Sequence, residues 1–158
     1  SKVDVGIKSA IAGINSEQAI YSYDSNELSE WKNDGKLSTA WITYHLERKA
    51  EIDDICIKLT GWRKRSYPLE IFADDKLVWS GNTEKSLGYI HLSVKPVRTD
   101  KITIKLKGEA KESDAFGQIV EVVEPNAGDL DLLRVKGGEK TNNELRIVEV
   151  EFLETLKK

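Results

Sequence analysis

At 158 residues, the chain is long enough to form one domain with a hydrophobic core of its own. Its net charge of −3 gives no general attraction to nucleic acids or anionic membranes, and no apolar run reaches the length of a membrane span. We therefore expect neither nucleic acid nor a membrane among its partners. The single cysteine, Cys56, cannot form a disulfide within the chain. The absence of methionine predicts that the chain is a piece of a longer protein.

Alternation of apolar and polar residues recurs along the chain and predicts half-buried β-strands. In "DDICIKLTG", for example, Ile55, Ile57 and Leu59 share one face, whereas Cys56 and Lys58 share the other. The predicted strands are residues 3–12, 41–47, 53–59, 68–73, 76–80, 88–94, 101–107, 117–123 and 146–152.

Helical periodicity is nearly absent, although "EQAIYSY" (residues 17–23) could form one helical turn. Residues 125–144 are rich in Gly and Asn and are predicted to be irregular. Many short strands separated by turns, without a strand–helix–strand rhythm, predict an all-β fold that is an antiparallel sandwich or barrel.

The signatures of catalysis are missing from the sequence. It contains no glycine-rich phosphate loop, no G-x-S-x-G elbow and no H-E-x-x-H pair, and its two histidines and one cysteine lack a recognisable zinc spacing. Glu149 and Glu151 would lie about 7 Å apart on one strand face, a separation also found in inverting glycosidases. The favoured interpretation is a solvated outer face, so no active site is predicted.

Aromatic and polar residues in turn-rich regions predict recognition of a sugar, which needs an aromatic platform and a few fixed hydrogen-bond donors. The loop "GWRKRSY" supplies Trp62, Arg63 and Arg65 together, and Asn82 and Trp31 are further candidate ligand-binding residues. The alternative is a surface turn with solvated cations and a tryptophan that plugs the end of the sandwich. Trp41 and Trp79, at strand ends, are predicted to pack in the core.

Several motifs resemble the discoidin-like (coagulation-factor type C) superfamily of galactose-binding-like carbohydrate-binding modules. "DGKLSTAW" resembles its D-G-x-x-x-T-x-W signature, and "LRIVEVEF" resembles its C-terminal strand. This resemblance implies an antiparallel β-sandwich of the jelly-roll type (galactose-binding domain-like) whose termini come close together.

A narrower resemblance concerns "WRKRSYPLEIFADDKLVWSGNTEKSLGYIHL" and "DAFGQIVEVVE", which look like C-terminal modules of family 2 glycoside hydrolases (β-galactosidase-like) from gut Bacteroidetes. It implies that residues 1–158 are a single non-catalytic module, excised from the C-terminal part of a larger enzyme. The expected partners are a glycan, with galactose-containing glycans as candidates, and the parent catalytic domain. The expected localisation is periplasmic, extracellular or on the cell surface. The alternative is a structural module that packs on the parent enzyme or a partner subunit without binding glycan.

The resemblance also implies positions for a cation and for a sugar. The family's calcium loop falls on Asp34, Thr39 and Glu149, but Lys36 stands where an acidic or amide residue is common, and an ammonium group repels a cation. No cofactor is therefore expected, apart from a possible structural Ca²⁺. The sugar-binding positions fall on Arg63 or Arg65, on Asn82, and on Trp62 with Trp31.

Overall fold

The computed structural model describes residues 1–61, 64–86, 88–108, 111–112 and 143–156 of the chain, with only the backbone at 111–112. The elements in chain order are β1 (Lys2–Val5), β2 (Ile7–Ala12), the 3₁₀-helix η1 (Ser16–Ser22), β3 (Trp31–Lys32), the 3₁₀-helix η2 (Leu37–Thr39), β4 (Trp41–Leu59), β5 (Arg65–Ser66), β6 (Pro68–Ala73), β7 (Lys76–Asn82), β8 (Ile90–Leu106), β9 (Lys111–Glu112) and β10 (Arg146–Thr155).

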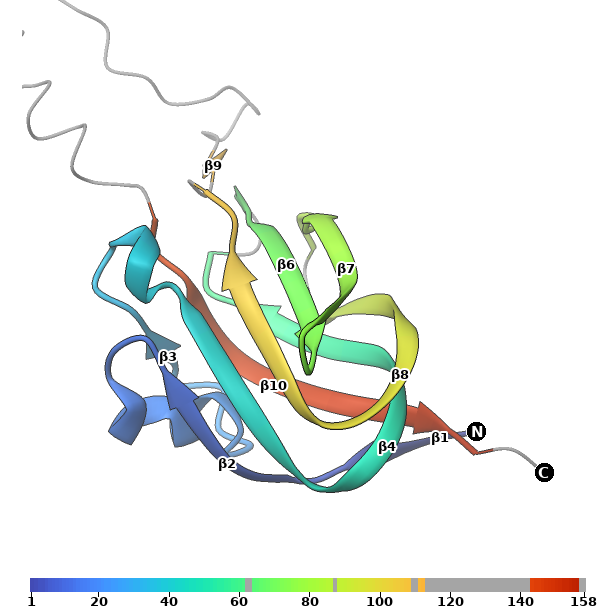
Figure 1. Cartoon of the computed structure of the whole chain (residues 1–158). Coiled ribbons are helices and arrows are strands. Elements are labelled where there is room, and N and C mark those ends of the chain that lie inside the picture. Colours follow the sequence, from blue (N-terminus) through green and yellow to red (C-terminus); the bar gives the residue numbers. More distant parts are fainter. Residues whose placement is uncertain (62–63, 87, 109–110, 113–142, 157–158) are drawn as a thin grey trace, which may run out of the picture.

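Two long strands, β4 and β8, build both layers of the sandwich. The strand order is β1-β10-β4-β8-β6-β7, β2 pairs with β4, and all the pairs are antiparallel. The first part of β4 pairs with β2, whereas its second part pairs with β10. In the same way, the end of β8 pairs with β6 and its start pairs with the second part of β4. Figure 1 shows both strands curving from one layer into the other. The predicted antiparallel β-sandwich is confirmed.

The core lies between these layers and contains the residues that alternation assigned to it. On β4, Ile55, Ile57 and Leu59 are fully buried, whereas Cys56 and Lys58 on the other face are half-buried. The same holds for the buried positions of β8 and β10, which are Ile90, Leu92, Val94, Ile102, Ile104, Leu106, Val148, Val150 and Phe152. Trp79 packs against this core from β7, and Trp41 is half-buried.

The predicted strands differ from the observed ones mainly in their continuity. Residues 41–47 and 53–59 are one strand, β4, because the intervening polar run "ERKAE" crosses between the layers with shifts of register on either side of Ile52. The predicted helical turn at 17–23 is confirmed as η1. The predicted strand at 117–123 and most of the irregular segment at 125–144 lie outside the described residues.

The two termini lie together at one end of the sandwich (Figure 1). The backbone N–H of Leu156 donates to the carbonyl of Ser1 at 2.9 Å, and Lys2 pairs with Thr155. The predicted proximity of the termini is confirmed. From Thr155, β10 leads back to Arg146 over ten residues, or about 30 Å of strand. The loops beside Arg146 therefore form the opposite end of the molecule, which we call the loop end.

Candidate functional site

The turn "NDGKLST" at the loop end is held by its own side chains. Gly35 has φ of +92°, which a residue with a side chain rarely adopts. Asp34 Oδ1 accepts hydrogen bonds from the Thr39 hydroxyl (2.5 Å) and from the backbone N–H of Lys36 (3.2 Å). The Thr39 bond is the main cause that lowers the pKa of Asp34 below its ordinary value. The local hydrogen bonds thus occupy the acidic group that the resemblance assigned to a cation.

The predicted cation ligands do not converge. Trp31 pairs with Ile147 and Lys32 with Arg146, so that the antiparallel ladder carries Asp34 away from Glu149. The Glu149 carboxylate instead accepts the backbone N–H of Ser25 at 2.8 Å. Among the described residues, no group of three or more His, Cys, Asp or Glu side chains could hold a metal ion. The residues present therefore do not fit a calcium site built from Asp34, Thr39 and Glu149.

Glu149 also differs from the predicted solvated face. Glu151 is exposed, but Glu149 is only 6% exposed, because the segment that contains Asp24 and Ser25 packs over it. Burial raises the pKa of Glu149 to about 7; the Ser25 bond opposes this shift, and the nearby Asp24 carboxyl adds to it. A polar depression of about 250 Å³ adjoins Glu149. Its lining residues are Asp4, Ile7, Tyr23, Ser25, Glu149, Val150 and Glu151.

At the loop end, a chain of ion pairs joins Glu30, the segment 144–146 and Arg65. Arg146 at the start of β10 donates to Glu30 from Nη2 (2.6 Å) and Nε (3.1 Å), and Glu30 also accepts the hydroxyl of Thr60. Burial raises the pKa of Glu30, but the bonds from Arg146 and Thr60 outweigh it and lower the pKa. Glu144 lies between Arg146 (3.8 Å) and Arg65 (3.6 Å). These contacts hold the loops of this end to the strands.

The predicted sugar-binding residues differ in their structural surroundings. Trp62 and Arg63 lie outside the described residues. Arg65 is half-buried on the ring of Tyr67, with 5.6 Å between its guanidinium and the ring centroid, whereas Asn82 is exposed at the end of the edge strand β7.

The structure corrects the prediction that Trp31 binds a sugar. This residue is fully buried, and its indole N–H donates to the carbonyl of Ile14 at 3.1 Å, so it is a core residue and offers no face to a sugar. Its position next to a turn hid this role, because burial of β3 depends on pairing with β10, more than 110 residues away.

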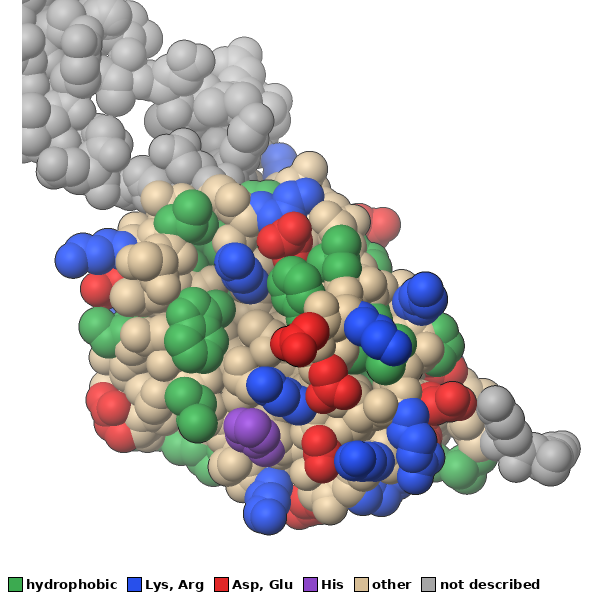
Figure 2. Space-filling model, in the orientation of Figure 1, with side chains coloured by type: hydrophobic (Ala, Val, Ile, Leu, Met, Phe, Trp, Pro, Cys, Tyr) green, Lys and Arg blue, Asp and Glu red, His purple; other side chains and the backbone are tan. Residues whose placement is uncertain are grey.

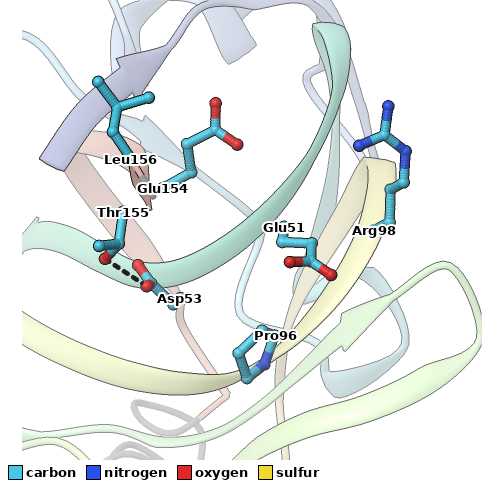
Figure 3. Close-up of a pocket in the computed structure, with 7 residues that line it drawn as sticks. All are labelled: Glu51, Asp53, Pro96, Arg98, Glu154, Thr155 and Leu156. Carbon is cyan, nitrogen blue, oxygen red and sulfur yellow. Dashed lines mark hydrogen bonds between the residues drawn. The ribbon is translucent and has the colours of Figure 1, made fainter. Parts of the chain in front are cut away.

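A second depression, of about 280 Å³, lies at the end that carries the termini (Figure 3). Its lining residues are Glu51, Asp53, Pro96, Arg98, Glu154, Thr155 and Leu156. The hydroxyl of Thr155 donates to Asp53 at 2.5 Å across its floor. None of the side chains that line this depression is aromatic.

A third cluster lies on the outer face of β4 and β8. His91 Nδ1 is 3.1 Å from Asp54 Oδ2, and His91 Nε2 is 3.8 Å from the sulfur of Cys56. Burial, followed by the negative charges of Glu151 and Asp54, raises the pKa of the Cys56 thiol. The alternation placed Cys56 and His91 on outward positions, but only the pairing of their strands reveals that they meet.

The rest of the visible surface has no dominant charge. Figure 2 shows lysine and arginine side chains interspersed with aspartates and glutamates over one face of the sandwich. Such mixing fits the small net charge and gives no electrostatic footprint for a polyanion on that face. Within the described ranges, no helix has the length and apolar character needed to cross a membrane.

Similar folds are found among solved structures. A truncated AlyQ with CBM32 and alginate lyase domains has a TM-score of 0.70 at 14% identity; the match covers all of this chain and 34% of that one. The CBM32 of AlyQ in complex with 4,5-unsaturated mannuronic acid has a TM-score of 0.65 at 14% identity, covering 95% of this chain and 97% of that one. The chain has the fold of family 32 carbohydrate-binding modules. The family 32 module from C. perfringens NanJ, in complex with galactose, has a TM-score of 0.59 at 14% identity and covers 98% of this chain.

These similarities concern the fold alone. The chain spans about a third of the length of the truncated AlyQ, whose remaining part includes a lyase domain. No protein-family model matches the sequence, and no curated protein matches it either. The discoidin-like fold is thus shown by structure, whereas ligand and parent enzyme are matters for a proposal.

Proposed function

We propose that the chain is a non-catalytic carbohydrate-binding module that targets an attached glycoside hydrolase to its glycan. The observation that carries this proposal is the arrangement of the sandwich: both termini lie at one end, and the loops next to Arg146 lie at the other. A domain attached through either terminus leaves the loop end open to a ligand. Solved modules of this fold were obtained with galactose and with an unsaturated mannuronic acid, and another is described as pectin-binding.

The sugar would bind at the loop end, around the loop "GWRKRSY". Trp62 supplies the aromatic face, and Arg63, Arg65 and Asn82 supply donors for sugar hydroxyl pairs. The ion pair with Glu144 holds Arg65 in place, so that less side-chain entropy is lost when a ligand binds. Because an arginine also pairs well with a carboxylate, uronic acids belong beside galactosides among the candidate ligands.

Calorimetry of the purified chain with galactosides and with oligosaccharides of alginate and pectin tests this proposal. We expect weak binding, because such a module acts mainly by raising the effective concentration of the enzyme. Trp62→Ala and Arg65→Ala should each weaken binding about tenfold, with thermal unfolding checking the fold. Lys95→Ala, an exposed change on β8, is the control. An absence of binding across a broad glycan panel would overturn the proposal.

The second candidate is a structural module that packs on its parent enzyme or on a partner subunit. It is favoured by the burial of Trp31 and Tyr67, two aromatic residues near the loop end that are not available to a sugar. In this case the loop end would be covered in the full-length protein. Deleting the module would then lower the stability of the enzyme or change its oligomeric state, and glycan affinity would not change.

The attached enzyme is proposed to be a family 2, β-galactosidase-like glycoside hydrolase, in a periplasmic, extracellular or cell-surface location. The sequences that flank residues 1 and 158 in the complete protein test both points. We further propose that no calcium ion is needed, because Asp34 is bonded within its own turn. Adding Ca²⁺ to chelator-treated protein should leave its melting temperature unchanged, whereas a clear rise would overturn this part of the proposal.

A further inference from the structure

The carboxylate of Glu144 lies between the two arginines of the loop end. Its Oε1 is 3.6 Å from Arg65 Nη1 and 3.8 Å from Arg146 Nη1. Both separations exceed the usual length of an N–H···O hydrogen bond, so these contacts are mainly electrostatic. Glu30 accepts hydrogen bonds from Nε and Nη2 of Arg146, so Nη1 is the atom of that arginine that faces Glu144. A carboxylate of the chain itself therefore occupies the position that a ligand's carboxylate would take between these arginines.

Glu144 is the most exposed of these three side chains. It is 35% exposed, whereas the side chains of Arg65 and Arg146 are 19% and 27% exposed. A ligand that reaches the two arginines from solvent thus comes close to the charge of Glu144. Water screens charges at such half-buried positions only in part, so a second carboxylate beside Glu144 is repelled.

A neutral sugar suits the same pair of groups. A hydroxyl group both donates and accepts hydrogen bonds, so one of two neighbouring hydroxyls can accept from the Arg65 guanidinium while the other donates to Glu144. A uronic acid that presents its carboxylate to Arg65 has no proton to donate to Glu144, and it adds a second negative charge beside the first. Binding sites reject wrong partners by placing like charges next to one another in this way.

We propose that Glu144 excludes carboxylate-bearing ligands from Arg65 and so directs the loop-end site to neutral sugars. This inference rests on the proposed function, and it narrows the candidate ligands from galactosides and uronic acids to uncharged sugars. Glu144 is then a specificity-determining residue in addition to a contact that holds Arg65 in place. Its charge decides which sugars bind, and its contact geometry alone does not.

Methyl galactoside and methyl galacturonoside provide the test, because they differ only in having a hydroxymethyl or a carboxylate group on the sugar ring. Calorimetry at low ionic strength measures both affinities. We expect the unmodified chain to bind the galactoside at least about fivefold more tightly. Glu144→Gln keeps the shape and removes the charge, so the ratio of the two dissociation constants should shift at least about fivefold toward the galacturonoside. A purely structural role of Glu144 would lower both affinities together and leave the ratio unchanged.

Glu154→Gln is the matched control. Glu154 is also ion-paired with an arginine, Arg48, but it lies near the end of β10 that carries the termini. The ratio of dissociation constants in this variant should equal that of the unmodified chain. An unchanged ratio in Glu144→Gln, or tighter binding of the galacturonoside by the unmodified chain, would overturn the proposal. Thermal unfolding verifies that each variant is folded.

Acetate, a carboxylate without a sugar, separates this inference from the proposed function. Its binding is followed at constant ionic strength through the NMR signal of the Arg65 side-chain Nε–H group. If Glu144 shields Arg65, acetate should bind at least about threefold more tightly to Glu144→Gln than to the unmodified chain. Equal acetate affinities would overturn the inference, whichever sugars bind. If neither chain bound any sugar, the proposed function would be wrong, and the acetate affinities would still decide whether Glu144 shields Arg65.

Discussion

The side chain of Asn33 accepts a hydrogen bond from the backbone N–H of Leu145, across 112 positions of sequence. Its Oδ1 accepts the buried N–H of Leu145 at 2.8 Å, and its Nδ2 donates to the carbonyls of Asn143 and Lys36, each at 2.9 Å. One amide therefore ties the "NDGKLST" turn to the segment that leads into β10. The hydrogen bonds of Asn33 fix the position of the turn at the loop end, and Gly35 allows its backbone conformation.

Replacing Asn33 should destabilise the fold. Asn33→Asp keeps the acceptor for Leu145 but turns the donor group into an oxygen that faces two carbonyls. We expect the free energy of unfolding to fall by about 2 kcal/mol or more, measured by urea denaturation at pH 8. Asn82→Asp, on an exposed residue, is the control and should be nearly neutral. Equal stability of both variants would contradict the assigned role of Asn33.

The stability of the fold should depend on pH through Glu149. Its pKa is about 7 in the folded state against an ordinary value of 4.5, so the folded state binds this proton more tightly than the unfolded chain does. This contribution to stability is complete below about pH 4.5 and is lost as pH rises through 7. The slope can reach about 1.4 kcal/mol per pH unit.

Glu149→Gln removes this titration and keeps an oxygen for the Ser25 N–H. The variant should therefore be more stable than the unmodified chain at pH 8, and its stability should change less between pH 5 and 7. Chemical denaturation at several pH values measures both effects. Glu151→Gln changes an exposed glutamate on the same strand and should preserve the slope. If the stability of Glu149→Gln changed with pH as much as that of the unmodified chain, Glu149 would not be the source of the pH dependence.

Trp31 should contribute to stability and not to glycan affinity. Trp31→Ala removes a fully buried ring and its bond to Ile14, which should cost about 3–5 kcal/mol. Trp79→Ala, at a half-buried position on β7, should cost less. The milder Trp31→Phe allows binding to be measured on folded protein. A folded Trp31→Phe variant that has lost glycan binding would show that Trp31 acts in recognition.

Gly13 is predicted to be sterically essential. A Cβ at this position would lie 2.5 Å from the carbonyl oxygen of Thr39 and 2.6 Å from its Cα, so the backbone itself would have to move. Gly13→Ala should lower the free energy of unfolding by about 1–3 kcal/mol. Gly88→Ala is the control, because nothing lies within 4 Å of the added atom. Thermal unfolding compares the two, and similar melting temperatures would refute the predicted clash.

Particular residues show how far local sequence predicts this molecule. The alternation in "DDICIKLTG" correctly assigns Ile55, Ile57 and Leu59 to the core, because a strand presents successive side chains to opposite faces. The same rule placed Glu149 with Glu151 on a solvated face, which was wrong for Glu149. The segment that covers Glu149 comes from residues 24–25 and depends on tertiary packing.

The sequence by itself determined the strand faces, the turn at Gly35 and the all-β character, because each depends on neighbours within a few positions. Only the tertiary structure decided that Trp31 is a core residue and that Asp34 and Glu149 do not meet. It also decided that Cys56 faces His91, 35 positions later. The physical reason is strand register: the pairing of distant strands sets which side chains become neighbours, and no local spacing encodes it.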